Sequence, residues 1–353
     1  MEQPIIEIEE KQETMVDYIK KVSPGNQLRL IIDDLQKAGL GSLIVFDSPK
    51  LQEQNIIEGG FKVNCRFTTQ KLFELCKMDG AIVISPDLRR IVSANVLLAP
   101  DNSIPSNETG TRHKAAERTA KQTGKFVIAV SERRKKTTLF FASSRYYLRP
   151  SEEVLRDLSS KLQILEKQRE ILDDLMSKLN ILEMSELVSV SDVCKVIQRS
   201  EMMLKISGSI KINFTELGRE GNIMHMRQRE LLKNIERNEG EVLRDYSPLN
   251  LKKAKTVLEN FSYDGLLDLE SIARLIFEKK LEENTSPQGY RFLSHIILTD
   301  KEIPALIKHF KELNKILSTD STEFEFLLKN RAEKVKEDIS NLREQILSGK
   351  VVC

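Results

Sequence analysis

The chain has 353 residues, 40% of them hydrophobic and 31% charged, and its 55 basic and 53 acidic residues leave a net charge of +2. At about 150 residues per domain, this length predicts two or three domains. The balance of charge excludes a polybasic tail protein and an acidic disordered chain.

The sequence contains no pattern that directs a protein to a membrane or an oxidising compartment. No apolar run approaches the roughly 18 residues of a membrane-spanning helix, and the first ten residues, MEQPIIEIEE, lack a signal-peptide pattern. The four cysteines form no CxxC pair and the four histidines no HExxH motif, so neither a disulfide framework nor a zinc ribbon is predicted. We therefore expect a cytoplasmic protein with no membrane partner.

The first 150 residues alternate between helical and strand patterns. Short apolar runs at residues 42–47, 81–85 and 126–131 are typical of buried strands. A helical pattern that ends near a glycine precedes each run, in LRLIIDDLQKAGLG, TTQKLFELCKMDG and HKAAERTAKQTG. Residues 1–150 are therefore predicted to form one α/β domain with helices covering a sheet.

A long helix is predicted to follow Pro150. Ser151 is a candidate N-cap, and leucines then recur every seven residues, at Leu158, Leu165, Leu172 and Leu179. Such a seam fits either a helix packed within its own chain or an intermolecular coiled coil, and we expect the first.

The helical pattern continues to about residue 280, which predicts a central helical domain over residues 151–285. SPQGY at residues 286–290 is the next clear break in the pattern. Short helices are expected after it, with Pro304 in a first helical turn, so residues 286–353 are predicted to form a compact all-helical module.

Asp79-Gly80-Ala81 lies where a helical pattern ends and a strand begins. A carboxylate beside a glycine that permits close backbone approach can hold a metal ion and the sugar of a ligand. An ordinary turn is the alternative, because Asp-Gly is a common turn sequence.

The segment ETGTRHK, residues 108–114, puts three basic residues where a helix is predicted to begin. Free N–H groups at a helix start attract anions, whereas the helix dipole disfavours basic side chains there. A bound polyphosphate would remove this conflict, and SERRKK at residues 131–136 adds further positive charge. Residues 91–150 contain 11 basic and 4 acidic residues, a net charge of +7, for which a solvated basic face is the alternative explanation.

Together these features predict a site for a nucleoside triphosphate with Mg²⁺ or Mn²⁺ at Asp79. Neither a GxxxxGK[ST] loop nor a GxGxxG motif after the first strand is present, so the two common nucleotide-binding folds are not predicted. A metal ion at Asp79 could lower the pKa of an attacking sugar hydroxyl. Phosphoryl-type transfer depends on positioning and charge stabilisation, so it needs no Cys or Ser nucleophile.

Several stretches of the sequence match one known family. They include LCKMDGAIVIS, SIPSNETGTRHKAAERTAKQTG and VIAVSERRK in the first domain, VIQRSEMM and ELGREG in the middle, and SPQGYRFLS near the end. On these motifs the chain resembles the DNA integrity scanning (DisA) proteins, a family of bacterial diadenylate cyclases, over nearly its whole length. SPQGYRFLS separates the full-length scanning proteins from membrane-anchored cyclases that share the catalytic domain.

The resemblance implies a mixed sheet flanked by helices in the catalytic domain, then a helical bundle, then a helix-hairpin-helix-like DNA-binding domain. It implies that two catalytic domains face each other and condense two ATP molecules into cyclic di-3′,5′-AMP and two pyrophosphates. It also implies a homo-octamer whose cyclase activity is slowed by branched DNA bound at its ends.

The functional residues of the family can be placed on matching positions of this chain. Asp79 corresponds to the acid that binds metal and helps to activate the 3′-hydroxyl, and Arg112 and His113 correspond to the remaining catalytic positions. The ATP-binding positions are Gly80, Ala81, Leu98, Thr111, Arg112, His113, Lys114, Ala115, Ser131 and Arg134. Lys114 replaces the usual arginine and loses its bidentate fork, and Ala115 replaces a common threonine, so we expect an active enzyme with a somewhat altered ATP affinity.

The C-terminal module departs further from the family. A Gly-apolar-Gly hairpin usually offers N–H groups to DNA phosphates, but the comparable residues 324–336, FEFLLKNRAEKVK, contain no glycine. Residues 286–353 carry 11 basic and 10 acidic residues, a net charge of only +1. Phosphate binding needs bare amides and positive charge, so we expect DNA binding that is weak or depends on avidity across an oligomer. The candidate contacts are Arg331, Lys334 and Lys336, with a solvated helix face as the alternative.

Two rival functions stay open at this point. One is a non-catalytic DNA-binding scaffold that retains a nucleotide-binding fold, and the other is an ATP-binding sensor without turnover. The intact Asp79-Gly80-Ala81 and Arg112-His113 sequences favour the enzyme over both.

Overall fold

The computed structural model describes residues 14–299, 301–328 and 331–349. The chain divides into two compact units, one made of residues 1–159 and 211–225 and the other of residues 160–210 and 226–353. The helices α6 (Ser151–Met184) and α7 (Val190–Leu217) each contribute residues to both units. No helix in the described ranges is both long and apolar enough to span a membrane. The three-part division at residues 150 and 285 stays a prediction.

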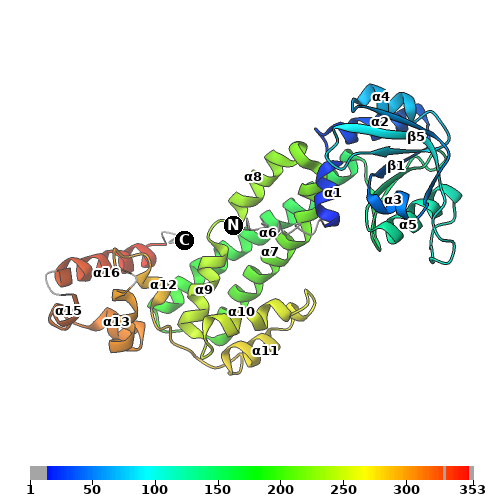
Figure 1. Cartoon of the computed structure of the whole chain (residues 1–353). Helices are drawn as coiled ribbons and strands as arrows, with labels where there is room; N and C mark the ends of the chain where they lie inside the picture. Colours follow the sequence, from blue (N-terminus) through cyan, green and yellow to red (C-terminus); the bar gives the residue numbers. More distant parts are fainter. Residues whose placement is uncertain (1–13, 300, 329–330, 350–353) are drawn as a thin grey trace, which may run out of the picture. The chain divides into compact units, whose positions relative to one another are not determined.

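The first unit is built on an eight-stranded mixed sheet (Figure 1). The strand order is β2-β5-β4-β1-β6-β7-β8, with β3 also paired to β5, and among these pairs only β1 and β4 run parallel within the described chain. The strands are β1 (Ser42–Phe46), β2 (Ile57–Glu58), β3 (Phe61–Arg66), β4 (Ala81–Ile84), β5 (Arg90–Leu98), β6 (Phe126–Val130), β7 (Thr137–Phe141) and β8 (Ser144–Leu148). The three predicted strands are the adjacent β4, β1 and β6, which confirms the predicted α/β fold.

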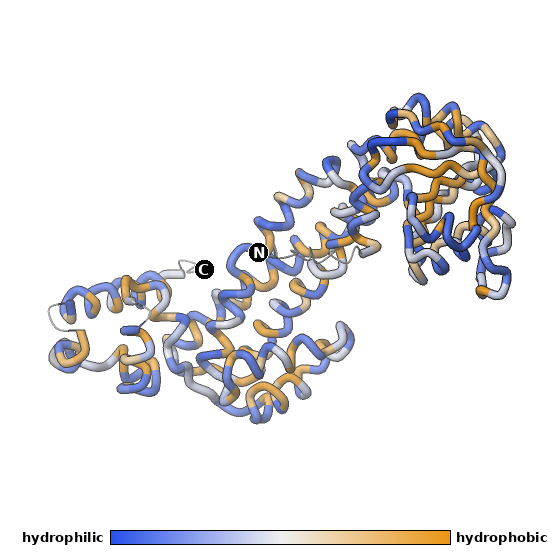
Figure 2. Tube along the Cα trace, viewed as in Figure 1, coloured by the Kyte–Doolittle hydropathy of each residue, from blue (hydrophilic) through white to orange (hydrophobic). Residues whose placement is uncertain are grey.

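Helices cover both faces of this sheet. Ile44 and Phe46 of β1 belong to one hydrophobic core with α1 (Met15–Lys21), α2 (Gln27–Ala38) and α4 (Thr69–Leu75). Leu43 and Val45 face the other core, with α3 (Pro49–Glu53) and α5 (Thr111–Thr123). Burial on both faces removes the alternation of polar and apolar residues, which is why these strands are continuous apolar runs (Figure 2).

Glycine ends two of these helices as the sequence predicts. Gly39 after α2 and Gly124 after α5 adopt left-handed φ values of 67° and 69°, a conformation that costs glycine little. Each helix therefore stops within a few residues of the strand that follows it, β1 or β6.

The leucine seam lies on α6, a single helix of 34 residues. Leu158, Leu165, Leu172 and Leu179 are all buried within this one chain, which confirms the expected intramolecular packing. Arg169 lies between Leu165 and Leu172 on the same helix. Its guanidinium binds the carbonyl oxygens of Leu231 and Lys233 at 3.1 and 2.9 Å.

The described residues between 218 and 347 are mostly helical, as the sequence predicts. The α-helices are α8 (Asn222–Leu231), α9 (Ile235–Tyr246), α10 (Leu251–Asn260), α11 (Leu269–Ile272), α12 (Tyr290–Leu293), α13 (Glu302–Phe310), α14 (Leu313–Ser318), α15 (Ser321–Leu328) and α16 (Ala332–Leu347). Short 3₁₀ segments at Gly218–Gly221 and Gly265–Leu267 and a π-helical turn at Ala273–Phe277 complete the set described by the structure. Pro304 lies in the first turn of α13, and Phe310, Phe324 and Ile339 share one hydrophobic core with α12 and α14.

Asp245, at the end of α9, holds the start of α12 in place. Its buried carboxylate accepts hydrogen bonds from the backbone N–H groups of Gly289, Tyr290 and Arg291 at 2.7, 2.6 and 3.0 Å. Gly289 has a φ of 112°, which a side chain would disfavour. The SPQGYRFLS stretch is therefore a structural junction that attaches the last helices to α9.

The guanidinium of Arg291 completes this junction from the other side. It is buried and binds the side chains of Asn180 and Glu183 on α6, while the Tyr246 hydroxyl donates to Glu183 at 2.5 Å. Burial, and then the neighbouring Glu183, raise the pKa of Asp245 to about 7. Glu183 is thus the ion-pair partner of the Arg291 guanidinium, whereas Asp245 binds the backbone N–H of Arg291 and lies within reach of its charge.

Candidate active site

Asp79 lies in the turn between α4 and β4, with its side chain fully exposed. The N–H of Gly80 donates to Oδ1 of Asn95 on β5 at 3.1 Å. A Cβ atom on Gly80 would lie only 2.4 Å from the backbone carbon of Asn95, so the close approach of these strands requires glycine. Ala81, the first residue of β4, is buried beneath the turn. The sequence signal for Asn95 is weak, although its φ of 52° is typical of Asn rather than of most residues.

A hollow of about 600 Å³ lies at the start of α5. Gly110 is the N-cap, and Thr111, Arg112 and His113 follow in the first helical turn, which contains no acidic residue. The opposite wall is the chain that leaves β6, from Ser131 to Arg134. The structure therefore brings the two basic segments of the sequence together around one cavity, as an anion site needs.

Arg112 connects this hollow to Asp79. Its Nη2 atom lies 3.4 Å from Oδ1 and 3.5 Å from the backbone oxygen of Asp79. Gly41, just before β1, leaves the space that the guanidinium fills, because a Cβ atom there would lie 2.4 Å from Nη1 of Arg112. Gly41 is thus a site residue that the sequence did not reveal.

His113 is half-buried in the wall of the hollow. Burial lowers the pKa of its imidazole, Glu108 opposes that shift, and Arg134 and Arg112 add to it. The ring is therefore neutral near pH 7 and can donate one hydrogen bond to a phosphate oxygen. Glu108, the first residue of the predicted ETGTRHK segment, is itself buried and forms an ion pair with Arg145 of β8 at 3.2 Å, a role that the sequence did not reveal.

The other predicted ATP contacts are more scattered. Leu98 ends β5 and is buried in the core beneath α5, and Ala115 packs against the same core. Lys114 is exposed on α5. The residues that line the hollow include Thr111, Arg112, His113, Ser131 and Arg134 but none of these three.

Comparisons with known proteins identify the family. The model described as DisA bacterial checkpoint controller nucleotide-binding matches residues 30–144, and the one described as DisA bacterial checkpoint controller linker region matches residues 148–283. The DNA integrity scanning protein DisA of Clostridium kluyveri is 38% identical over 351 residues, 96% of this chain and 98% of the relative. That of Acetivibrio thermocellus is 36% identical over 348 residues, 95% and 96% of the two chains.

The chain belongs to the DisA family. Among solved structures, DacA from Staphylococcus aureus is 22% identical and covers 41% of this chain and 95% of its own, with a TM-score of 0.31 that supports no inference. Cys65, Cys76 and Cys194 of this DisA family member are free cysteines.

Two of the three candidate DNA contacts are bound within this DisA chain. Arg331 forms an ion pair with Glu302 at 2.9 Å and donates to the backbone oxygen of Ile297 at 2.6 Å. Lys336 donates to the backbone oxygens of Leu317 and Thr319. Only Lys334 of the three is an exposed side chain without such a bond to any described residue.

Proposed function

We propose that this protein is a diadenylate cyclase, which condenses two ATP molecules into cyclic di-3′,5′-AMP and two pyrophosphates. The observation that supports this best is the contact of Arg112 with Asp79, because it joins the carboxylate proposed to bind metal to a hollow of about 600 Å³ at a helix N-terminus. Family membership is independent support for the same activity.

In this proposal each chain binds one ATP. Thr111, Arg112, His113 and Arg134 hold the triphosphate in the hollow, and Gly80 permits close approach of the sugar. The 3′-hydroxyl of one ATP attacks the α-phosphorus of the ATP in the facing chain, a new P–O bond forms, and the bond to the β-phosphate oxygen breaks to release pyrophosphate. The hydroxyl proton passes to Asp79. In a second step of the same kind, the 3′-hydroxyl of the other nucleotide attacks the remaining α-phosphorus, releases the second pyrophosphate and closes the ring.

The donor atoms around Asp79 fit a divalent ion that arrives with ATP. Among the described residues no three His, Cys, Asp or Glu side chains come together to hold a metal ion. Mg²⁺ is commonly bound by one or two carboxylates together with substrate phosphates and water, and Asp79 provides one exposed carboxylate. When bound there, Mg²⁺ or Mn²⁺ would neutralise phosphate charge and favour ionisation of the hydroxyl.

The proposal extends to assembly, location and partners. Asp79 is fully exposed, so a second copy of the chain can bring its ATP directly to this carboxylate. The resemblance to the family points to an octamer in the cytoplasm, with branched DNA sensed by residues 286–353 and inhibiting the cyclase. Lys114 is exposed and Ala115 is half-buried, and both lie outside the hollow. Their differences from the usual arginine and threonine of the family are therefore expected to alter ATP affinity only modestly.

A product assay on the full-length protein tests this function. ATP is supplied with Mg²⁺ or Mn²⁺, with and without a four-way DNA junction, and the products are identified by mass spectrometry. We expect cyclic di-AMP, a slower rate with the junction, and no product after chelation of the metal. ATP binding without any product would instead favour the ATP-binding sensor without turnover.

Asn95 is proposed as a positioning residue for Asp79, and its replacement tests that role. Asn95→Gly tolerates the left-handed backbone but removes the oxygen that Gly80 N–H binds, so we expect kcat to fall about 10-fold through misplacement of the carboxylate. More metal should be needed for half-maximal activity, while KM for ATP changes less. Asn95→Asp retains an acceptor and should keep a larger share of kcat. Equal, wild-type kcat values in both variants would contradict the role.

A further inference from the structure

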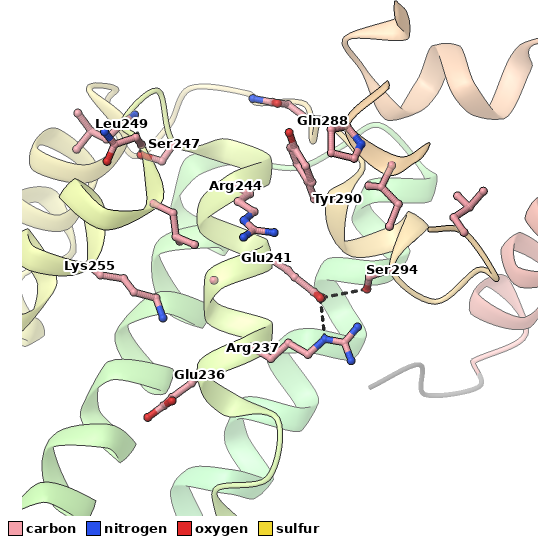
Figure 3. Close-up of a pocket in the computed structure, with 16 residues that line it drawn as sticks. Glu236, Arg237, Glu241, Arg244, Ser247, Leu249, Lys255, Gln288, Tyr290 and Ser294 are labelled. Atoms are coloured by element: carbon pink, nitrogen blue, oxygen red, sulfur yellow. Dashed lines mark hydrogen bonds and ion pairs between the residues drawn. The ribbon is translucent and has the colours of Figure 1, made fainter. Parts of the chain in front are cut away.

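A second and larger hollow, of about 1180 Å³, lies in the unit of residues 160–210 and 226–353 (Figure 3). Its walls come from α9, α10, α12, the start of α13 and the connections between them. No residue of the proposed ATP site lines it. A ligand here would contact α9 and α10 together with the helices of the C-terminal module.

Two cations in this hollow are available to a ligand. Arg244 forms no hydrogen bond or ion pair with any described residue, and its guanidinium lies over the ring of Tyr290, 5.9 Å from the centroid. Lys255 likewise has no direct carboxylate partner in the described chain, although its charge opposes the burial that raises the pKa of Glu239. Arg237 differs, because Glu241 binds it at 2.9 Å.

The chain segment that carries these two side chains is basic, although the carboxylates of Glu236 and Glu241 also line the hollow. Residues 244–255 contain four basic residues and one acidic residue, Asp245, which is buried against backbone N–H groups. The additional cations, Lys252 and Lys253, are exposed on the first turn of α10. The segment has a net charge of +3, whereas the whole of residues 286–353 has +1.

The guanidinium of Arg244 lies over the ring of Tyr290, which also packs against the core of the last helices and has its backbone held in place. Figure 3 shows Tyr290 next to Arg244, with Gln288 above them and Lys255 on the neighbouring helix. The backbone N–H of Tyr290 donates to the carboxylate of Asp245 at 2.6 Å, which fixes the backbone at this residue. An aromatic face for a base next to cations for phosphates is the usual arrangement for binding a single nucleic-acid strand.

We infer that this hollow binds an unpaired DNA strand, with Arg244 and Lys255 on its phosphates and the ring of Tyr290 against a base. The inference rests on the proposed function, in which DNA is a partner, and locates a contact surface away from residues 324–336. Those residues lack glycine, and Arg331 and Lys336 among them are bound within the chain, whereas Arg244 and Lys255 have no direct carboxylate partner among the described residues.

Fluorescence anisotropy with a labelled single-stranded oligonucleotide tests the inference on the full-length protein across a range of salt concentrations. Arg244→Ala and Lys255→Ala should each weaken binding by about 10-fold and lower the slope of log K against log salt by about one. Tyr290→Leu should weaken binding by a similar factor with little change in slope, while Tyr290→Phe retains the stacking face and should bind as the wild type does. Arg229→Ala, at an exposed arginine of α8, is the matched control.

The outcomes separate this inference from the proposed function. Suppose that the wild type binds DNA and that the Arg244, Lys255 and Tyr290→Leu variants bind within twofold of it with unchanged salt slopes. The hollow is then not the DNA site, but the proposal that the protein binds DNA is retained. If the wild type binds no DNA, the DNA part of the proposed function fails and the inference fails with it. Unchanged thermal unfolding midpoints of the Arg244 and Lys255 variants will show that lost binding is not lost folding.

Discussion

Asp79→Asn is expected to abolish cyclic di-AMP synthesis, with kcat at least about 1000-fold lower, because the amide cannot hold the metal ion as a carboxylate does or accept the hydroxyl proton. The side chain is fully exposed and its main contact is Arg112, so the fold and ATP binding should persist. Product formation by mass spectrometry and ATP binding by calorimetry measure the two effects separately.

Asp34→Asn is the matched control for this substitution. Asp34 is an exposed carboxylate on α2 in the same unit, away from the turn before β4, and its loss should leave the rate within twofold of the wild type. If Asp79→Asn also retained a rate within 10-fold of the wild type, the role assigned to Asp79 would be wrong.

Arg291→Ala should destabilise the unit that contains α9 and α12 by about 3–5 kcal/mol, since it leaves the buried carboxylate of Glu183 without its ion-pair partner and removes the positive charge near Asp245. Urea unfolding followed by circular dichroism measures the loss. Removal of the arginine leaves carboxylates that can take up protons, so the deficit should be smaller at pH 5 than at pH 8.

Arg237→Ala provides the comparison for Arg291. Its side chain is 61% exposed, although its partner Glu241 is only 12% exposed, so we expect a loss of about 1 kcal/mol, well below that for the buried pair of Arg291. A double variant, Arg291→Met with Glu183→Met, should recover part of the loss because it removes the unpaired charge along with the arginine. A loss below about 1 kcal/mol for Arg291→Ala would show that the junction is not held by this network.

Local features of the sequence were sufficient to predict the centre of the first unit. β1, β4 and β6 are apolar runs because helices bury both of their faces, and Gly39 and Gly124 end helices because each residue adopts a left-handed conformation. The ETGTRH segment also predicted an anion site. The first turn of the helix that it begins has basic residues and no acidic one, an arrangement that favours a bound anion. The edge strands were missed because their exposed residues produce no apolar run.

Contacts between distant segments created the rest of the candidate active site. Arg112 reaches Asp79 across 33 residues, and does so through the space left by Gly41 on a third segment. Asn95 supports Gly80 across 15 residues, from a left-handed position in β5. No local sequence pattern predicts these two contacts, because they depend on the order of the strands and on the close approach of their backbones.

Charge shows the same division most clearly. The sequence by itself determined how many cations each segment has, and so predicted a basic stretch over residues 91–150 and a nearly neutral C-terminal module. Only the tertiary structure decided which cations a ligand can reach: Arg331 and Lys336 bind their own chain, whereas Arg244 forms no hydrogen bond or ion pair with any described residue. The physical reason is that a side chain's charge is a property of its residue type, while its availability depends on the acceptors that folding brings within hydrogen-bond distance.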